Sequence, residues 1–126
     1  MLSIAENDKE NTVKAYCQGW LKLLSSNAYF EAEKLINSVN SYGETWKINQ
    51  IEEAVKDYFN DNADVSFHYE DIENCYPEFL ETENGALLFG FYLPANGEIT
   101  DLTVEFEFTS LGNSKYAACI NNVHVL

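Results

Sequence analysis

The most regular pattern of apolar and polar residues lies between positions 86 and 108, where two apolar segments flank a turn. In the second segment, apolar residues alternate with acidic residues or Thr. The apolar positions are Leu102, Val104, Phe106 and Phe108, and the polar positions are Asp101, Thr103, Glu105 and Glu107. This period of two predicts a strand that buries one face and presents a row of carboxylates on the other.

The first segment, residues 86–93, is apolar at both odd and even positions. Such a pattern is typical of an interior strand that is covered on both faces. Gly90 inside this segment predicts a bulge or the close approach of another backbone. The preceding Asn84-Gly85 pair predicts a hairpin turn, and residues 78–83 are expected to form its first strand.

Two further connections continue the strand pattern. Asn96-Gly97 is a second turn signal of the same kind, and residues 111–114 contain Gly, Asn and Ser. We therefore expect an antiparallel meander that ends in a strand over residues 115–126, bent near residues 121–122.

Helical spacing dominates the N-terminal half of the chain. An apolar stripe predicts a first helix that packs on the sheet, and its positions are Val13, Tyr16, Cys17, Trp20 and Leu24. Residues 3–6 have the S-x-x-E form of a capping box, while Asn11 is a second candidate for the start of the helix. The polar residues 25–27 are expected to end it.

Two more apolar stripes predict two more helices. The second helix is expected to end at Tyr42-Gly43, and its stripe consists of Ala28, Ala32, Leu35, Ile36 and Val39. The third helix is expected to begin at Thr45 and to end at residues 60–62. Its stripe consists of Ile48, Ile51, Val55, Tyr58 and Phe59.

After the third helix the period changes from helical to alternating. Residues 65–70 predict a short strand, and residues 71–77 predict a loop or a single turn. The order of elements indicates an α+β fold in which about three N-terminal helices pack on a C-terminal antiparallel meander of four to five strands. At 126 residues, the chain is expected to form a single domain over residues 1–126.

The charge of the chain narrows the classes of partner. The chain has 21 acidic residues, 7 Lys and no Arg, for a formal net charge of -14. Residues 57–126 contain 13 of the acidic residues and only one Lys. Such a field repels nucleic acid and anionic membranes and attracts a basic protein, so we expect a basic protein partner, with no nucleic acid and no membrane. The alternative that the charge serves only solubility stays open at this point.

The cysteines and the N-terminus bear on location. Cys17, Cys75 and Cys119 are odd in number and widely spaced, which favours reduced thiols over a disulfide framework or a zinc site. The first residues lack a basic segment followed by an apolar one, and no apolar run approaches the length of a membrane helix. These features predict a cytoplasmic protein.

Acidic residues and neighbouring tyrosines are the candidate binding residues, because carboxylates that repel one another on adjacent strands are tolerated where a cationic surface docks. The predicted partner-binding residues are Tyr69, Glu70, Asp71, Glu73, Glu81, Glu83, Asp101, Glu105 and Glu107. Glu78, Glu98, Tyr76 and Tyr92 lie near them in the sequence. A solvated sheet face without a partner is the alternative.

Signals for catalysis, metals and cofactors are weak. Asp57, Asp61 and Asp64 lack the loop spacing of an EF-hand, so no metal site is predicted. The chain has no G-x-S-x-G motif and no glycine-rich phosphate loop, so we expect neither catalytic residues nor a cofactor. The alternative is an enzyme or ligand binder with a pocket near His68, Tyr92 and Asp101, in which either His68 or His124 pairs with a carboxylate such as Asp101 as a general base.

Two resemblances add to this interpretation. The chain resembles nuclear-transport-factor-like and SnoaL-like domains in two features. One is the order of helices followed by strands. The other is the segment from residues 13–16 through residues 27–32, where one helix ends in a short polar break and a second begins at once. This resemblance implies a cone-shaped fold, which is shared by isomerase-type enzymes, ligand binders and scaffolds. The chain departs from the commonest order of that family, where a strand hairpin precedes the meander.

The chain also looks like the immunity proteins of bacterial polymorphic toxin systems, including those of contact-dependent growth inhibition. The resemblance lies in a small acidic chain with an aromatic-rich sheet and in the ending of residues 121–126. It implies a protein that neutralises a basic toxin domain, for example a nuclease, by binding it directly. It carries over no catalytic residues, because that role requires none.

Overall fold

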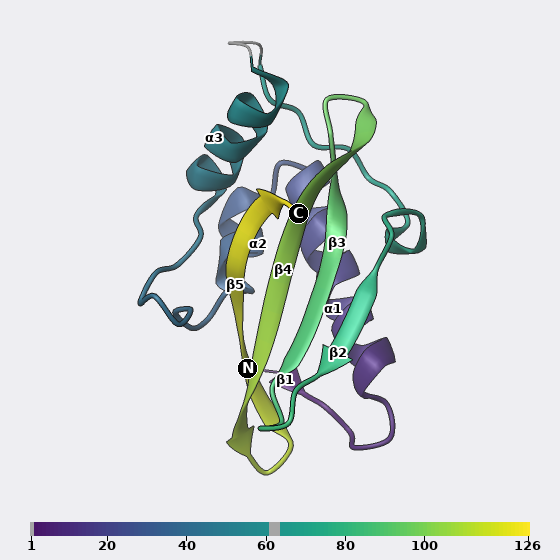
Figure 1. Cartoon of the computed structure of the whole chain (residues 1–126), viewed down its shortest axis with the longest axis vertical. Helices are drawn as coiled ribbons and strands as arrows, with labels where there is room; N and C mark the ends of the chain where they lie inside the picture. Colours follow the sequence, from purple (N-terminus) through teal and green to yellow (C-terminus); the bar gives the residue numbers. More distant parts are fainter. Residues whose placement is uncertain (1, 61–63) are drawn as a thin grey trace.

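The computed structural model describes residues 2–60 and 64–126. Within these residues the chain forms a curled antiparallel sheet with strand order β1-β5-β4-β3-β2 (Figure 1). The strands are β1 (Leu2–Ser3), β2 (Glu78–Glu81), β3 (Leu87–Ala95), β4 (Glu98–Gly112) and β5 (Lys115–Val125). The helices are α1 (Lys9–Ser25), α2 (Tyr29–Lys34) and α3 (Ile48–Phe59), with a 3-10 turn at Ile72–Asn74. The predicted α+β class, with helices first and a meander after them, is confirmed.

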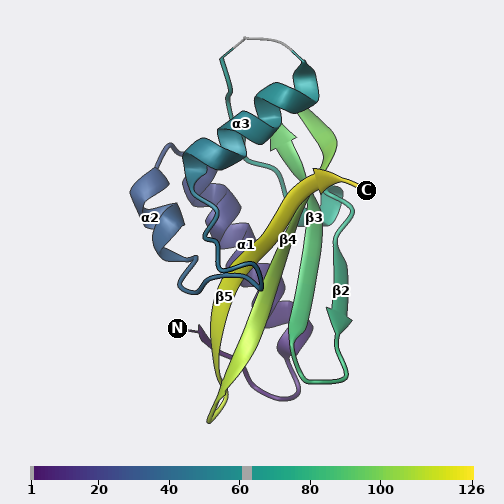
Figure 2. The ribbon, with the colours of Figure 1, turned by 60° about the vertical axis from the view of Figure 1, so that its left-hand side comes forward.

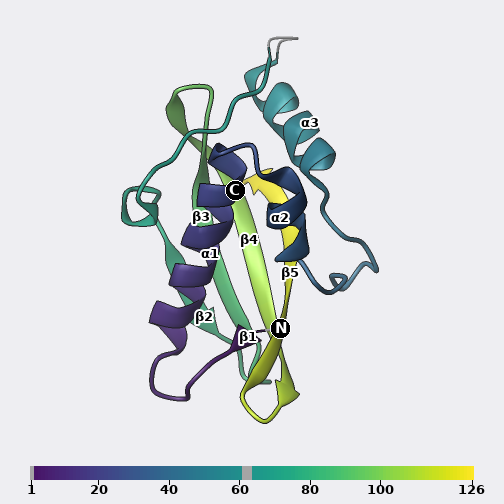
Figure 3. The same cartoon turned by 180° about the vertical axis from the view of Figure 1, so that it is seen from behind.

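The helices lie on one side of the sheet. Seen from behind, α1 and α2 lie in front of the strands (Figure 3), whereas the view of Figure 1 meets the bare strands. The side view separates a helical layer from the sheet layer in the same way (Figure 2). The molecule therefore has two layers, and one broad face of the sheet is not covered by a helix.

Aromatic side chains fill the space between the two layers. Trp20 of α1 is fully buried, and its ring meets those of Phe91 and Phe106 edge to face, with centroids 6.3 and 5.3 Å apart. Phe106 stacks in turn on Phe91 and Phe108 at 6.2 and 6.0 Å. Such aromatic pairs each stabilise the fold by about 0.5–1.5 kcal/mol beyond the free energy gained from burying their surface. The predicted stripe of α1 is confirmed, since Val13, Cys17, Trp20 and Leu24 are all buried.

Alternation along the strands agrees with the sequence for β4. Leu102, Val104, Phe106 and Phe108 are buried toward the helices. In β3 the odd residues from Leu87 to Leu93 are buried in the same way. The even residues of β3 lie on the face without helices, so the prediction that this strand is covered on both sides is wrong. The register shift between β3 and β4 falls between Tyr92 and Pro94, not at Gly90.

Turn chemistry placed the hairpins correctly. Gly85, Asn96 and Gly97 have positive φ of 88°, 51° and 84°, as tight hairpin turns require. Asn113 and Ser114 also have positive φ and close the β4–β5 turn. The bend predicted near residues 121–122 is confirmed as a bulge, because Glu105 pairs with Asn122 and the next residue of β4 pairs with Ile120.

Both predicted starts of the first helix are wrong. Ser3 lies in β1 and pairs with Lys115 of β5, and Ile4 is buried, so this segment extends the sheet rather than capping a helix. The helix begins at Lys9 instead, and the carboxylate of Asp8 just before it accepts a hydrogen bond from the side-chain amide of Asn11.

The second helix ends at Lys34, earlier than Tyr42-Gly43, because the following segment leaves the helical path to cover the edge of β5. The backbone N–H groups of Asn37 and Ser38 both donate to the carbonyl of Ala118. The amide of Asn40 donates to the carbonyl of Ile120 at 3.2 Å. Val39, expected in the stripe, is 58% exposed as a result.

The third helix begins at Ile48, not at Thr45, because two side chains from other positions satisfy its first N–H groups. Glu33 of α2 accepts from the N–H of Ile48 at 2.8 Å, and Gln50 accepts from that of Lys47 at 2.7 Å. The predicted stripe is confirmed by the burial of Ile48, Ile51 and Val55, and the helix is followed by Asn60 with φ 52°.

Residues 65–70 do not form the predicted strand. Phe67 makes a single bridge to Ala95, and beyond it the carbonyl of Glu70 accepts from the side-chain amide of Gln18 on α1. The segment therefore touches only the end of β3 and the turn after it, and forms no paired strand. The loop or turn predicted for residues 71–77 is confirmed as the 3-10 turn.

Candidate functional site

The face of the sheet that lies opposite the helices is called the open face here. Its residues follow from the pairing register of β2, β3 and β4, and they are Glu78, Leu80, Leu88, Gly90, Tyr92, Thr103, Glu105 and Glu107. Because side chains alternate between the two faces of a strand, these residues point away from the aromatic core.

Gly90 creates a gap in the middle of this face. Glu78 on β2 and Glu105 on β4 both pair with Gly90, which lies between them on β3. Neighbouring strands are about 4.8 Å apart, so the Cα atoms of the two glutamates are separated by about 10 Å. Since glycine has no side chain, the position between the two glutamates on the open face is unfilled.

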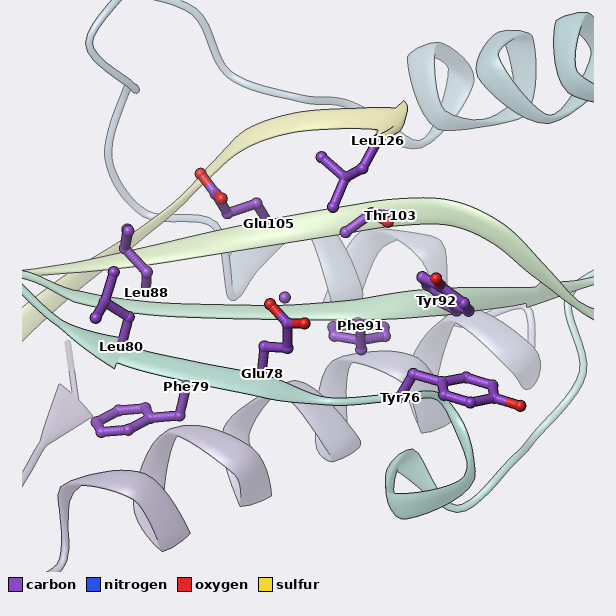
Figure 4. Close-up of a pocket in the computed structure, with 11 residues that line it drawn as sticks. Tyr76, Glu78, Phe79, Leu80, Leu88, Phe91, Tyr92, Thr103, Glu105 and Leu126 are labelled. Carbon is purple, nitrogen blue, oxygen red and sulfur yellow. The ribbon is translucent and has the colours of Figure 1, made fainter.

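A hollow of about 480 Å³ lies over this gap, and it is called the tyrosine-end hollow (Figure 4). The rings of Tyr76 and Tyr92 stand at one end with centroids 5.0 Å apart. Leu80 and Leu88, which are directly paired across β2 and β3, stand at the other end. Between the two ends, Glu78, Gly90, Thr103 and Glu105 line the hollow together with Leu126.

A second hollow of about 490 Å³ continues toward the β2–β3 turn, and it is called the hairpin-end hollow. Leu88 lines both hollows, so they lie next to each other along the open face. The hairpin-end hollow is more polar, and its lining includes Glu83, Asn84, Glu107 and Asn121. We call the two hollows together the open-face groove.

One asparagine holds two of the carboxylates of the groove. The side-chain amide of Asn121, at the bulge of β5, donates to Glu107 at 2.8 Å and to Glu105 at 3.1 Å. Like charges on one strand face repel each other, and the shared donor offsets part of that repulsion. The bulge therefore fixes both glutamates in one place on the open face.

The lysines of the chain are placed elsewhere. Lys9 of α1 contacts Glu81 at 2.7 Å, and Lys14 of the same helix pairs with Glu73. Lys34 lies over the ring of Phe30 on α2. Among the described residues that line the two hollows, none is a lysine. The carboxylates of the groove thus lack a counter-charge from the described part of the chain.

The predicted binding residues divide into those at the groove and those with other contacts. Glu83, Glu105 and Glu107 line the groove. Glu73 and Glu81 are paired with the lysines of α1. The remaining predicted residues lie outside the lining of the groove, and they are Tyr69, Glu70, Asp71 and Asp101.

The side chains of Asp71 and Glu70 make local contacts. Asp71 accepts from the N–H of Glu73, and Glu70 accepts from the side chain of Asn74. Tyr69 is 55% exposed. Sequence reasoning missed Leu80, Leu88 and Asn121 as groove residues. For Leu88 the signal was the even-numbered apolar residues of β3, but that signal also fits a strand covered on both faces.

The alternative site of His68, Tyr92 and Asp101 is not assembled in this structure. Tyr92 lines the tyrosine-end hollow, but neither His68 nor Asp101 does. Asp101 instead accepts a hydrogen bond of 2.7 Å from the hydroxyl of Tyr58 on α3, which raises the pKa of that phenol.

The cysteines are buried and protonated rather than poised for chemistry. All three are free. Burial raises the pKa of the Cys75 and Cys119 thiols to about 11 and that of Cys17 well above its usual value. A nucleophilic cysteine needs the opposite shift.

The residues that the structure describes contain neither a cluster of metal ligands nor a helix that could cross a membrane. Within residues 2–60 and 64–126, no group of three or more His, Cys, Asp or Glu side chains is arranged to hold a metal ion. Of the three aspartates considered from the sequence, Asp61 lies outside the described residues. None of the described helices has both the length and the apolar character needed to cross a membrane.

Comparison with known proteins adds no assignment. No protein-family model, no curated protein and no solved structure shows significant similarity to the chain. The open-face groove is therefore the feature of this chain that bears on function.

Proposed function

We propose that this protein is an acidic inhibitor that binds a basic protein domain, and that it acts as an immunity protein for a toxin. The observation that carries the proposal is the open-face groove, where four carboxylates without a lysine among the described lining residues lie on a sheet face that no helix covers. These carboxylates are Glu78, Glu83, Glu105 and Glu107. The resemblance to immunity proteins names the same class of partner.

The composition of the groove supports a protein partner. Tyr76 is 69% exposed and Leu80 is 58% exposed, and both stand beside carboxylates. Protein interfaces combine an apolar and aromatic centre with charged residues around it, and tyrosine is enriched among their anchoring residues. The groove holds both kinds of side chain, with acids between a tyrosine end and a leucine end.

The charge of the whole chain supports rapid encounter with such a partner. A net charge of -14, concentrated in the half that forms the sheet, attracts a basic surface over distances of about a Debye length. For an inhibitor, fast association matters because the partner must be captured before it acts. Inhibition then follows from covering the partner's active site or an adjacent surface.

The experiment that tests this proposal is a calorimetric titration. The full chain is titrated with the C-terminal domain of the polypeptide encoded immediately upstream, at about 0.01 M and about 0.15 M salt. We expect tight binding that weakens as the salt concentration rises. Absence of binding at both salt concentrations contradicts the proposal and favours the alternative of a small-molecule binder, which a ligand screen against the groove then tests.

A further inference from the structure

We propose that the tyrosine-end hollow is a socket for one arginine side chain of the partner protein. This inference deepens the proposed function and rests on it for the identity of the partner as a protein. It concerns one position, the gap over Gly90, and it names the chemical group that fills the gap.

The carboxylates on either side of Gly90 call for a cation in the gap. Glu78 and Glu105 flank the glycine from the two neighbouring strands, with Cα atoms about 10 Å apart. The three ion pairs found among the described residues involve Lys9 and Lys14 and leave both of these glutamates without a cationic partner, although Glu105 accepts a hydrogen bond from the side chain of Asn121. A cationic group that enters between them can contact both carboxylates.

The two ends of the hollow fit the rest of an arginine side chain. The rings of Tyr76 and Tyr92 provide a surface on which a planar guanidinium stacks. Leu80 and Leu88 at the opposite end provide an apolar surface for a methylene stem. Figure 4 shows the glutamates between these two apolar ends.

Arginine fits this combination better than lysine does. A guanidinium presents donors in a planar fork that matches a carboxylate, and it stacks on aromatic rings, whereas an ammonium is compact and strongly hydrated. The chain itself contains no Arg, so a second copy of it cannot supply the group. The occupant therefore comes from a different protein.

The hollow persists because residue 90 is glycine, although the backbone there tolerates a side chain. A Cβ at this position meets Thr103 Cγ2 and the carbonyl oxygen of Val104 at 3.7 Å, an ordinary contact distance. Its φ is not in the left-handed region, so neither turn geometry nor crowding requires glycine. A glycine inside a strand normally weakens that strand, and it often marks a place where a ligand approaches the backbone closely. A side chain bound in the gap over Gly90 therefore explains why this position is glycine.

The first test uses a small probe and the intact chain. N-acetyl-arginine methylamide is titrated into the isotopically labelled protein, and amide resonances are followed by NMR. We expect saturable shifts, with millimolar affinity, centred on the amides of Gly90, Thr103 and Glu105. The corresponding citrulline compound, which has the same shape without the charge, is the matched control. Equal shifts with both compounds, or no shift at Gly90 with the arginine compound, overturn the inference.

The second test uses substitutions in the hollow. G90V fills the gap, and E78Q removes one carboxylate charge while keeping the size of the side chain. We expect G90V to weaken binding of the arginine compound and of the partner domain by about thirtyfold or more, as for an interface hot spot. G19A on α1 is the control, because a Cβ at Gly19 meets no atom within 4 Å, and its binding should be unchanged.

Folding of the variants is checked by thermal unfolding, in which G90V and G19A are expected to be at least as stable as the parent chain. If G90V unfolds at a lower temperature, E78Q alone decides the outcome. Unchanged binding of the partner by G90V and E78Q overturns the socket but leaves the proposed function intact. Binding of the arginine compound without any binding of the upstream-encoded domain supports the socket and contradicts the proposed function.

Discussion

At the scale of single residues, Asn121 shows how the open face tolerates its charge. Its amide donates to both Glu105 and Glu107, which lie two positions apart on β4. Without this donor, the two neighbouring carboxylates on this side of β4 would repel each other, and the described contacts contain no other group that offsets the repulsion. The side-chain amide of Asn121 therefore allows β4 to carry two adjacent carboxylates without losing stability.

We predict that N121A lowers the free energy of unfolding by about 1–3 kcal/mol, because hydrogen bonds to charged groups are lost and the repulsion remains. Urea unfolding at neutral pH measures the change. N122A is the matched control, since the side-chain oxygen of Asn122 has no partner among the described residues and its loss should cost less. In a double-mutant cycle, N121A should cost less when Glu107 is already Gln, and full additivity contradicts the explanation.

The buried thiols make a prediction about alkaline pH. Burial raises the pKa of Cys75 and Cys119 to about 11 in the folded chain, against 9.0 for an unperturbed thiol. Below pH 9 both states keep their protons, so stability is unaffected. Between pH 9 and 11 the unfolded chain loses thiol protons that the folded chain retains, so the unfolded state binds fewer protons and stability falls as the pH rises.

Urea unfolding at a series of pH values from 7 to about 11 measures this slope. The triple variant C17A/C75A/C119A should show a shallower decline above pH 9 than the parent chain, although tyrosines such as Tyr16, whose pKa burial raises to about 12, retain part of it. An identical pH dependence in the triple variant would contradict the role of the thiols.

At the scale of elements, the segment after α2 protects one edge of the sheet. Asn40 is 6% exposed. Its side-chain oxygen Oδ1 accepts from the backbone N–H groups of Tyr42 and Glu44, while its side-chain Nδ2 donates to the backbone carbonyl of Ile120. An unpaired strand edge invites pairing with another chain. Through this asparagine, an irregular segment takes the place of a further strand beside β5.

We predict that N40A lowers the free energy of unfolding by about 2–4 kcal/mol, since the buried carbonyl of Ile120 and the part-buried N–H groups of Tyr42 and Glu44 lose their partner. Urea unfolding measures the loss, and hydrogen exchange should accelerate at the amides of Tyr42 and Glu44. N74A is the control, because Asn74 makes an exposed hydrogen bond to Glu70 and its removal should cost less than about 0.5 kcal/mol. Equal costs for N40A and N74A would refute the protective role.

The strands were predictable from sequence because their signals are local. The Asn84-Gly85 and Asn96-Gly97 pairs set the turns, and the alternation of β4 sets which face is buried. Helix boundaries were less predictable because residues far away in sequence decide them. Glu33 satisfies the first N–H of α3, for example, and no local pattern near Ile48 contains that information.

The candidate site was predictable in part for the same reason. Glu105 and Glu107 follow from the period of β4 alone. The groove, however, depends on which face of the sheet the helices leave uncovered, and the apolar pattern of β3 pointed to cover on both faces. The pairing of Glu73 and Glu81 with α1 also required the fold, since each partner lies more than 50 positions away in sequence.

At the scale of the whole molecule, charge is divided between the two layers. Lysines of α1 pair with acids at the edge of the sheet, while the acids of the open-face groove have no such pairs among the described residues. We therefore expect the acids of the groove to contribute more to the field of the protein than the acids paired with lysines do. This division predicts that acids of the groove and acids of the helices contribute unequally to association.

We predict that E105Q/E107Q slows association with the partner domain by about three- to tenfold at low salt and reduces its salt dependence. Glutamine keeps an acceptor for Asn121, so the strand should remain folded. E31Q/E53Q is the control, because it removes the same charge from exposed positions of α2 and α3. Stopped-flow measurement at several salt concentrations compares the two pairs, and equal slowing by both would move the contact away from the groove.

The two-layer arrangement also has a consequence for protein engineering. The largest fully buried side chains lie in the helices and on the helix-facing side of the strands, so they stay constant when residues of the open face are exchanged. Randomising Leu80, Leu88, Gly90 and Glu105 gives a combinatorial library on a rigid sheet. Selection from such a library would yield binders of new specificity without redesign of the core.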